Sequence, residues 1–152
     1  MKTIQKFVNK YIFILAITLV FSTFSIAQES NALISNLYKA HKKKSVLSWN
    51  KPALKNYFSD NLANLIYKSQ QKNDEGIGFD ILFDTQDDSD IKTYKVVTES
   101  AGTKQGISKV SVSFKNFGES KKLIFTVDNK TNKIKDIQYL SHNSSLVKLL
   151  SN

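Results

Sequence analysis

The sequence predicts an α+β domain in which two or three helices pack on a curved antiparallel meander of four strands. Apolar residues recur at helical spacing in the first half of the chain, whereas β-branched and aromatic residues dominate short stretches of the second half. The connections between those stretches are short and rich in turn-forming residues, so neighbouring strands should pair as hairpins. Helices and strands in separate blocks are typical of α+β domains.

Residues 1–27 have the features of a cleavable secretory signal peptide. Lys2, Lys6 and Lys10 form a positive leader, the run Tyr11–Phe21 is apolar, and Ser25-Ile26-Ala27 places small residues where a signal peptidase cuts. The alternative is a retained transmembrane anchor, but the apolar run is shorter than the roughly 20 residues that span a bilayer. We therefore expect cleavage after Ala27 and a periplasmic or secreted protein without a membrane anchor.

The composition of residues 28–152 restricts the classes of function. These 125 residues suit a single domain. Removal of the leader takes away three lysines and no acidic residue, so the formal net charge falls from +9 to +6. The chain has no cysteine, which excludes disulfides, thiolate catalysis and thiolate metal sites. It has no arginine either, and no aromatic residues interrupt the lysine run Lys42–Lys44, so we expect a solvated basic face and no nucleic-acid partner.

Three helices are expected after the leader. The first covers Asn31–Trp49, and its lysines near the carboxyl end suit the helix dipole. Asn50-Lys51-Pro52 is a cap followed by a proline that suits a first helical turn, and a short helix should follow. Ser59 can cap a third helix over roughly Asp60–Gln71.

An acidic connector over residues 72–90 then leads into the predicted sheet. The turns between strands contain glycine, asparagine and aspartate, and Ser144 or Ser145 can cap a last helical turn that carries four apolar residues. The predicted strands are Ile91–Ser100, Ile107–Phe117, Lys122–Asp128 and Ile134–Ser141.

The most distinctive sequence lies in the connector, where Gly78-Phe79-Asp80-Ile81-Leu82-Phe83-Asp84-Thr85-Gln86-Asp87 follows the helices. An Asp-x-x-x-x-Asp-x-Gln-Asp element in this position, in an exported chain, resembles the bacterial envelope family called domain of unknown function 3828. Further residues that carry the resemblance are Tyr57-Phe58, Leu62 and Lys135-Asp136-Ile137. The resemblance implies the cone of the nuclear transport factor 2-like and cystatin-like folds and an envelope location, but no reaction. It makes Asp80, Asp84, Gln86 and Asp87 the expected ligand or partner surface at the open end of the cone.

The same acidic run raises the question of a metal site. Asp84, Gln86, Asp88 and Asp90 alternate and could direct oxygens toward a hard cation such as calcium. The calcium-loop pattern is incomplete, because no glycine stands at the sixth position and Lys95 replaces the closing glutamate.

A structural role for the run is favoured over the metal site. Asp80 and Asp87 can cap turns, and Gln86 can satisfy buried backbone groups. We expect no metal and no cofactor.

An enzyme is the alternative class of function. A carboxylate and a histidine in the mouth of a cone can act as a general base and its partner, so Asp80, Asp84, Asp136, His41 and His142 are candidates. Both histidines are expected to be exposed, one beside the lysine run and one in a polar turn.

The leading hypothesis is therefore an exported, non-enzymatic binding module for an unknown protein or small-molecule ligand in the cell envelope. A periplasmic immunity or inhibitor protein is one form of it. The alternative is a small isomerase, cyclase or hydrolase in which Asp80 or Asp84 is the general base.

Overall fold

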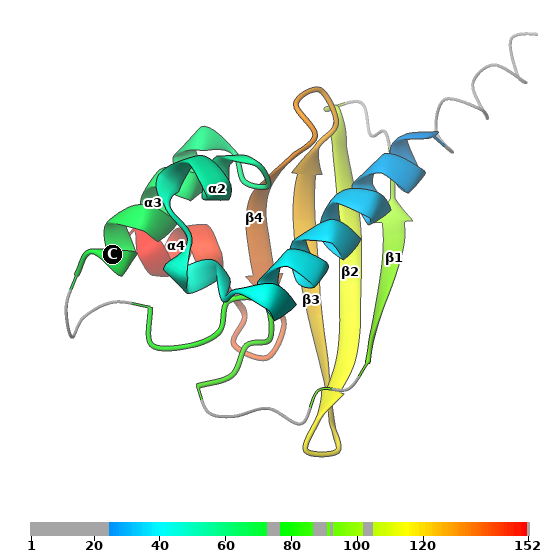
Figure 1. The fold of residues 1–152 in the computed structure, drawn as a ribbon. Coiled ribbons are helices and arrows are strands. Elements are labelled where there is room, and N and C mark those ends of the chain that lie inside the picture. The colour runs from blue at the N-terminus through cyan, green and yellow to red at the C-terminus, as the bar shows by residue number, and fades with distance from the viewer. Residues whose placement is uncertain (1–24, 73–76, 87–90, 92, 102–104, 152) are drawn as a thin grey trace, which may run out of the picture.

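A computed structural model describes residues 25–72, 77–86, 91, 93–101 and 105–151 (Figure 1). The predicted leader lies almost entirely outside these residues. A long helix over residues 25–43 comes first, and a short 3-10 helix (Val46–Ser48) follows it. The remaining elements are α2 (Lys51–Lys55), α3 (Asp60–Gln70), β1 (Tyr94–Ser100), β2 (Ile107–Asn116), β3 (Glu119–Asp128), β4 (Lys133–Tyr139), β5 (Ser144–Ser145) and α4 (Leu146–Leu150).

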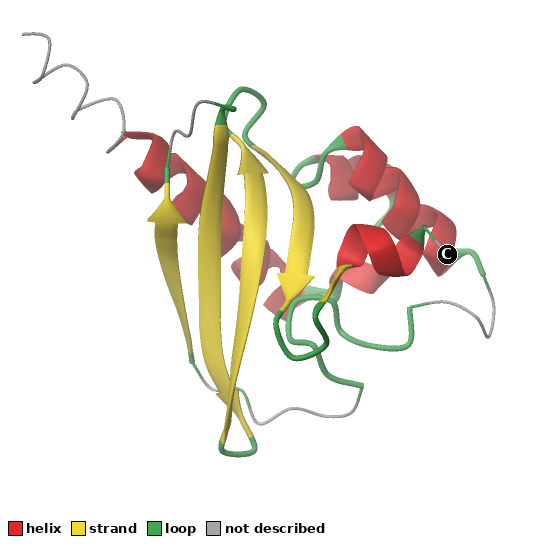
Figure 2. Cartoon of the chain, turned by 180° about the vertical axis from the view of Figure 1, so that it is seen from behind, coloured by secondary structure: helices red, strands yellow, loops and turns green. Residues whose placement is uncertain are grey.

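The strands form one antiparallel sheet in the order β1-β2-β3-β4-β5. The long helix crosses one face of this sheet, and α2, α3 and α4 gather beside β4 (Figure 1). Seen from behind, the strands lie in front of the long helix, and no described helix crosses their other face (Figure 2). We call the first face the inner face and the second the outer face.

Alternation along the strands explains why the inner face carries the core. In β2, Val110, Val112 and Phe114 are buried toward the helices, and Leu123 and Phe125 of β3 lie opposite Val112 and Val110. The intervening residues of each strand point to the outer face, because successive side chains of a strand alternate. One core therefore lies between the sheet and the helices.

The α+β prediction is confirmed in its coarser form, with corrections to element bounds. The first helix is described from residue 25 and ends at residue 43, before the expected end at Trp49, because Ser45 starts a separate 3-10 turn by accepting from the Leu47 amide. Asn50, Ser59 and Ser145 cap α2, α3 and α4 as their sequence positions predict. The four predicted strands are present, and the two-residue strand β5 was not predicted.

An irregular segment, residues 77–86, completes the core. Ile81 and Leu82 are fully buried although they belong to no helix or strand, so their carbonyl groups need partners inside the protein. The Tyr38 hydroxyl on the long helix donates to the Leu82 carbonyl at 2.6 Å, and the Tyr139 hydroxyl on β4 donates to the Ile81 carbonyl at 3.1 Å. Two tyrosines thus hold the segment between the helix and the sheet.

Removing either hydroxyl should destabilise the fold. Tyr38→Phe or Tyr139→Phe leaves a buried carbonyl without its donor, which should lower the free energy of unfolding by about 1–3 kcal/mol. Burial raises the pKa of both phenols above the ordinary 10.0. Since the unfolded phenols ionise near pH 10 and the folded ones do not, stability should fall as the pH rises above about 10, and less steeply in the variants.

Urea unfolding between pH 8 and pH 11 measures both effects. Tyr67→Phe is the matched control, because Tyr67 is half-buried on α3. Equal stability of all three variants at pH 8 would show that the two hydroxyls do not hold the segment.

Candidate functional site

The segment that the sequence singles out is folded into a tight loop around Asp80. The Asp80 amide donates to the Thr85 carbonyl, and the Asp84 amide donates to the Asp80 carbonyl, both at 2.7 Å. The side-chain Oδ1 of Asp80 accepts from the Leu82 amide at 2.8 Å, which confirms that this aspartate caps a turn. Asp84 has a φ of +50°, a left-handed conformation that aspartate tolerates better than most residues.

The second oxygen of Asp80 binds His41 of the long helix. His41 Nε2 donates to Asp80 Oδ2 at 2.8 Å, and His41 Nδ1 accepts from the Val46 amide at 3.1 Å. Since an accepting Nδ1 carries no proton, the ring is the neutral Nε2–H tautomer in this arrangement. Every polar atom of the two side chains is engaged inside the protein.

The prediction that His41 is exposed is wrong. Only 8% of the residue is accessible, because the helix turns His41 toward the core and away from its neighbours Lys42 and Lys43. The ring of Phe83 lies 5.6 Å from the imidazole, centre to centre. Burial between Phe83 and the loop gives this histidine a structural role.

A second aspartate–histidine pair closes the other end of the loop. Asp84 is buried, and its Oδ1 accepts from His142 Nε2 at 2.9 Å while its Oδ2 accepts from the Ser141 hydroxyl at 2.5 Å. The His142 side chain is 57% exposed, as expected for its turn. The serine bonds the carboxylate and not the imidazole, so the three residues do not form a nucleophile–base–acid relay.

The two pairs differ in what they can do. Both oxygens of Asp80 already accept hydrogen bonds within the protein and its histidine is buried, so the geometry does not favour it as a general base. Asp84, Gln86 and His142 line a hollow of about 460 Å³, which keeps an accessible imidazole next to an oriented carboxylate. Asp136 is used elsewhere, because its Oδ1 accepts from the amides of Ile137 and Val147.

The rest of the acidic run is only partly described by the structure. Gln86 is exposed, and it makes no side-chain hydrogen bond to a buried backbone group of the described residues, where the structural prediction expected one. Asp87, Asp88 and Asp90 lie outside the described residues. Within the described part of the chain, no three His, Asp or Glu side chains are close enough together to hold a metal ion.

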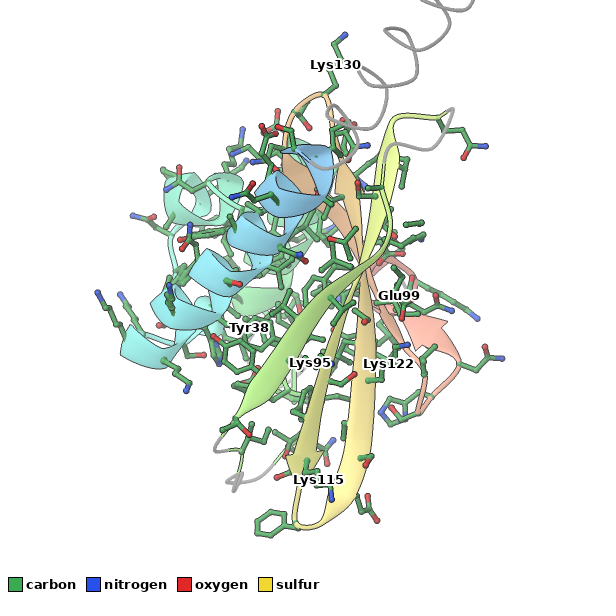
Figure 3. The ribbon with its side chains drawn as sticks, turned by 90° about the vertical axis from the view of Figure 1, so that its right-hand side faces the viewer. Tyr38, Lys95, Glu99, Lys115, Lys122 and Lys130 are labelled. Atoms are coloured by element: carbon green, nitrogen blue, oxygen red, sulfur yellow. The ribbon has the colours of Figure 1, made fainter. Side chains whose placement is uncertain are left out.

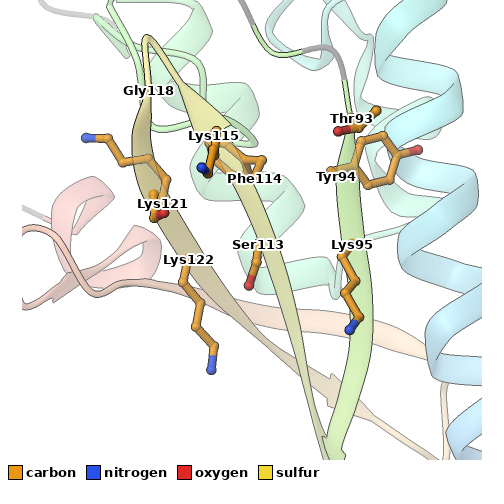
Figure 4. Close-up of a pocket in the computed structure, with 10 residues that line it drawn as sticks. Thr93, Tyr94, Lys95, Ser113, Phe114, Lys115, Gly118, Lys121 and Lys122 are labelled. Atoms are coloured by element: carbon orange, nitrogen blue, oxygen red, sulfur yellow. The ribbon is translucent and has the colours of Figure 1, made fainter.

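A second surface, which we call the lysine groove, is more open than the hollow at Asp84 and His142. It is a groove of about 830 Å³ across β1, β2 and β3 (Figure 4), and none of its lining residues is acidic. Four of them are lysines and three carry hydroxyl groups on serine or threonine. The lining residues are Thr93, Tyr94, Lys95, Ser113, Phe114, Lys115, Gly118, Ser120, Lys121 and Lys122.

Strand register brings three of these lysines, Lys95, Lys115 and Lys122, together on the outer face, whereas Lys121 lies opposite Phe114 at an inner-face position of β3. Ser113 of β2 lies between Lys95 of β1 and Lys122 of β3, and Lys115 lies opposite Ser120. In Figure 3, Tyr38 lies on the side of the long helix whereas Lys122 lies on the opposite side of the strands.

Only part of this positive charge is neutralised nearby. Glu99 of β1 forms an ion pair with Lys122, which holds the pKa of that carboxyl below its ordinary value. Lys95 and Lys115 are exposed and have no ion pair among the described residues. Two cations beside hydroxyl groups therefore remain available to an anion.

No motif in the sequence predicts this groove. The signal was present as alternation, since Lys95, Ser113, Lys115 and Lys122 occupy polar positions between the apolar residues of three strands. The dense run Lys42–Lys44 is the more conspicuous basic feature of the sequence, whereas lysines spread over three strands become neighbours only through register.

Comparison of the chain with protein-family models, with curated proteins and with solved structures found no match. Among the described residues, no helix is both long enough and apolar enough to cross a membrane.

The two histidine pairs should contribute unequally to stability. His41→Ala leaves Asp80 Oδ2 and the Val46 amide without their hydrogen-bond partner, so the free energy of unfolding should fall by about 3 kcal/mol. His142→Ala removes a largely exposed ring and should cost less than about 1 kcal/mol. Urea unfolding at pH 7 measures both, and equal losses would contradict the distinction between a buried and an accessible pair.

Proposed function

We propose that this chain is an exported, non-enzymatic binding module that holds phosphate-bearing anionic ligands of the cell envelope in the lysine groove. The observation that carries the proposal is the convergence of four lysines and three hydroxyl groups on one groove whose described lining contains no acidic residue. The acidic loop, by contrast, uses its carboxylates to hold the core together.

The chemistry of the groove suits phosphate better than a carboxylate of fixed orientation. Lysine is a compact, hydrated point charge that binds phosphate without requiring two parallel hydrogen bonds, whereas planar bidentate recognition needs arginine. Ser113 and Ser120 add hydroxyl donors between the cations. A ligand with several phosphates along its length matches a groove that crosses three strands.

The proposal also covers the fold family of the chain and the cellular compartment in which it works. A long helix across the inner face of a strand meander is the arrangement expected of a nuclear transport factor 2-like cone, and the acidic loop resembles an element of the domain of unknown function 3828 family. Export after cleavage at Ala27 would place the module in the periplasm or outside the cell. There the anionic polymers and lipids of the envelope are its ligands.

Two other functions receive less support. An inhibitor that inserts an acidic rim into a partner's active site needs accessible carboxylates, but Asp80 and Asp84 are engaged internally. A small enzyme is favoured only by the hollow at Asp84 and His142, where a buried carboxylate orients an exposed imidazole. Neither explains the lysine groove.

Neutralising the groove should weaken anion binding. The double variant Lys95→Gln/Lys115→Gln removes the two exposed groove lysines that have no ion pair among the described residues, and its affinity for inorganic polyphosphate should be roughly tenfold lower, at up to about 1 kcal/mol for each cation. The affinity of the unaltered protein should fall as the salt concentration rises. Binding releases counterions from the polyphosphate, and a higher salt concentration opposes that release. Isothermal titration calorimetry at 50 and 200 mM salt measures both.

The matched control is Lys39→Gln/Lys130→Gln, which removes the same charge from two exposed positions outside the groove. Figure 3 shows Lys130 at the opposite end of the sheet from Lys115. Equal weakening by the two double variants would mean that net charge alone binds polyphosphate. No binding by the unaltered protein would refute the proposed function.

Export is tested separately by the mass of the protein recovered from cells that express the whole chain. We expect it in the periplasm or medium with Gln28 as its first residue, because the leader is removed after Ala27. A full-length mass confined to the membrane fraction would contradict this prediction.

A further inference from the structure

The hairpin that borders the lysine groove ends in an unusual turn. Asn116 pairs with Glu119, so the loop between β2 and β3 consists of Phe117 and Gly118 alone. Both residues have positive φ, +47° and +83°, which is a type I′ turn. This turn favours asparagine or glycine, and a side chain such as phenylalanine costs roughly 1–2 kcal/mol in the left-handed conformation.

The strained residue is also strongly exposed. Phe117 is 68% accessible, the most of the four large apolar residues that are exposed in the described part of the chain. The hairpin of β2 and β3 projects beyond the neighbouring strands at this end of the sheet (Figures 1 and 2). The fold thus presents an aromatic ring at its most protruding turn, at a position where turn chemistry alone would select another residue.

Cations follow the ring along both strands of the hairpin. Lys115 precedes it by two residues, and Lys121 and Lys122 follow it by four and five. All three line the lysine groove, which therefore begins at the turn and runs away from it (Figure 4). The one acidic residue at the turn, Glu119, is exposed beside Gly118.

An exposed aromatic ring followed by several lysines matches the chemistry of an anionic lipid surface. Phenylalanine is one of the apolar side chains that peripheral proteins insert at the boundary between the lipid head groups and the acyl chains. Each lysine near an anionic leaflet is attracted to its phosphates, and the long aliphatic stem lets the amine reach them while the ring inserts. A free phosphate polymer satisfies the lysines but gives the ring nothing to enter.

We propose that the β2–β3 hairpin docks the protein onto anionic membranes, with Phe117 inserted at the lipid interface and the lysine groove on the phosphate head groups. This proposal rests on the proposed function of the groove and names its ligand. Attachment is peripheral and reversible, because one ring and a few lysines supply it.

The test measures sedimentation of the exported protein with vesicles of phosphatidylcholine and phosphatidylglycerol in equal parts, against vesicles of phosphatidylcholine alone. Binding is expected to the first and to be at least tenfold weaker to the second. Phe117→Asn is expected to weaken binding to the anionic vesicles by about tenfold, since it removes the apolar ring. The same variant places the residue that the turn favours, so its thermal midpoint should equal or exceed that of the unaltered protein.

A tryptophan probe tests insertion directly. Phe117→Trp should keep vesicle binding, and its emission should shift to the blue and be quenched by lipids brominated on the acyl chain. Leu140→Trp, at an exposed position in the turn after β4, is the matched control and should show neither change.

The outcomes separate this inference from the proposed function. Binding to polyphosphate without binding to anionic vesicles would overturn the membrane inference and leave the phosphate groove standing. Vesicle binding that Phe117→Asn does not weaken, or equal binding to both vesicle types, would overturn the membrane inference as well. Absence of binding to both polyphosphate and vesicles would overturn the two together.

Discussion

The fold depends on the need to satisfy the backbone of one irregular segment that is buried in the core. Residues 80–84 belong to no long helix or strand, yet their apolar side chains fill the space between the long helix and the sheet. Buried carbonyl and amide groups outside regular structure need partners from side chains. Tyr38, Tyr139 and Asp80 supply them, and His41 in turn supports Asp80. Helix, loop and sheet are therefore held by one polar network that crosses an otherwise apolar interior.

This network explains why the most distinctive sequence is not the most accessible surface. An acidic, aromatic-rich run is typical of a binding loop when it is exposed, but the same residue types also serve a loop that is buried. Asp80 and Asp84 turn inward to their histidines, and the outer face of the sheet is left as the broad polar surface. The strongest motif and the best-supported binding surface are thus separate features of the molecule.

Most of the fold could be predicted from the sequence, and most of the site could not. The helix caps at Asn50 and Ser59 and the alternation in β2 are local signals, so they give the elements and their order. The burial of His41 depends on a loop 39 residues later in the chain, and no local pattern reveals such a contact. The lysine groove forms only when β1, β2 and β3 pair in the observed register. In the β2–β3 hairpin that register depends on the two-residue turn at Phe117 and Gly118, and the sequence pattern alone does not predict it.

The absence of arginine from the chain has a consequence for how long a ligand stays. Lysine amines hold phosphate through mobile, well-hydrated contacts without the fixed fork of a guanidinium group, so each contact breaks and re-forms independently. If the lysine groove binds phosphates as proposed, it would exchange one phosphate for the next without releasing all of them together. The bound protein would therefore dissociate quickly and diffuse laterally across a charged surface, which suits a module that surveys the surface more than one that marks a single point on it.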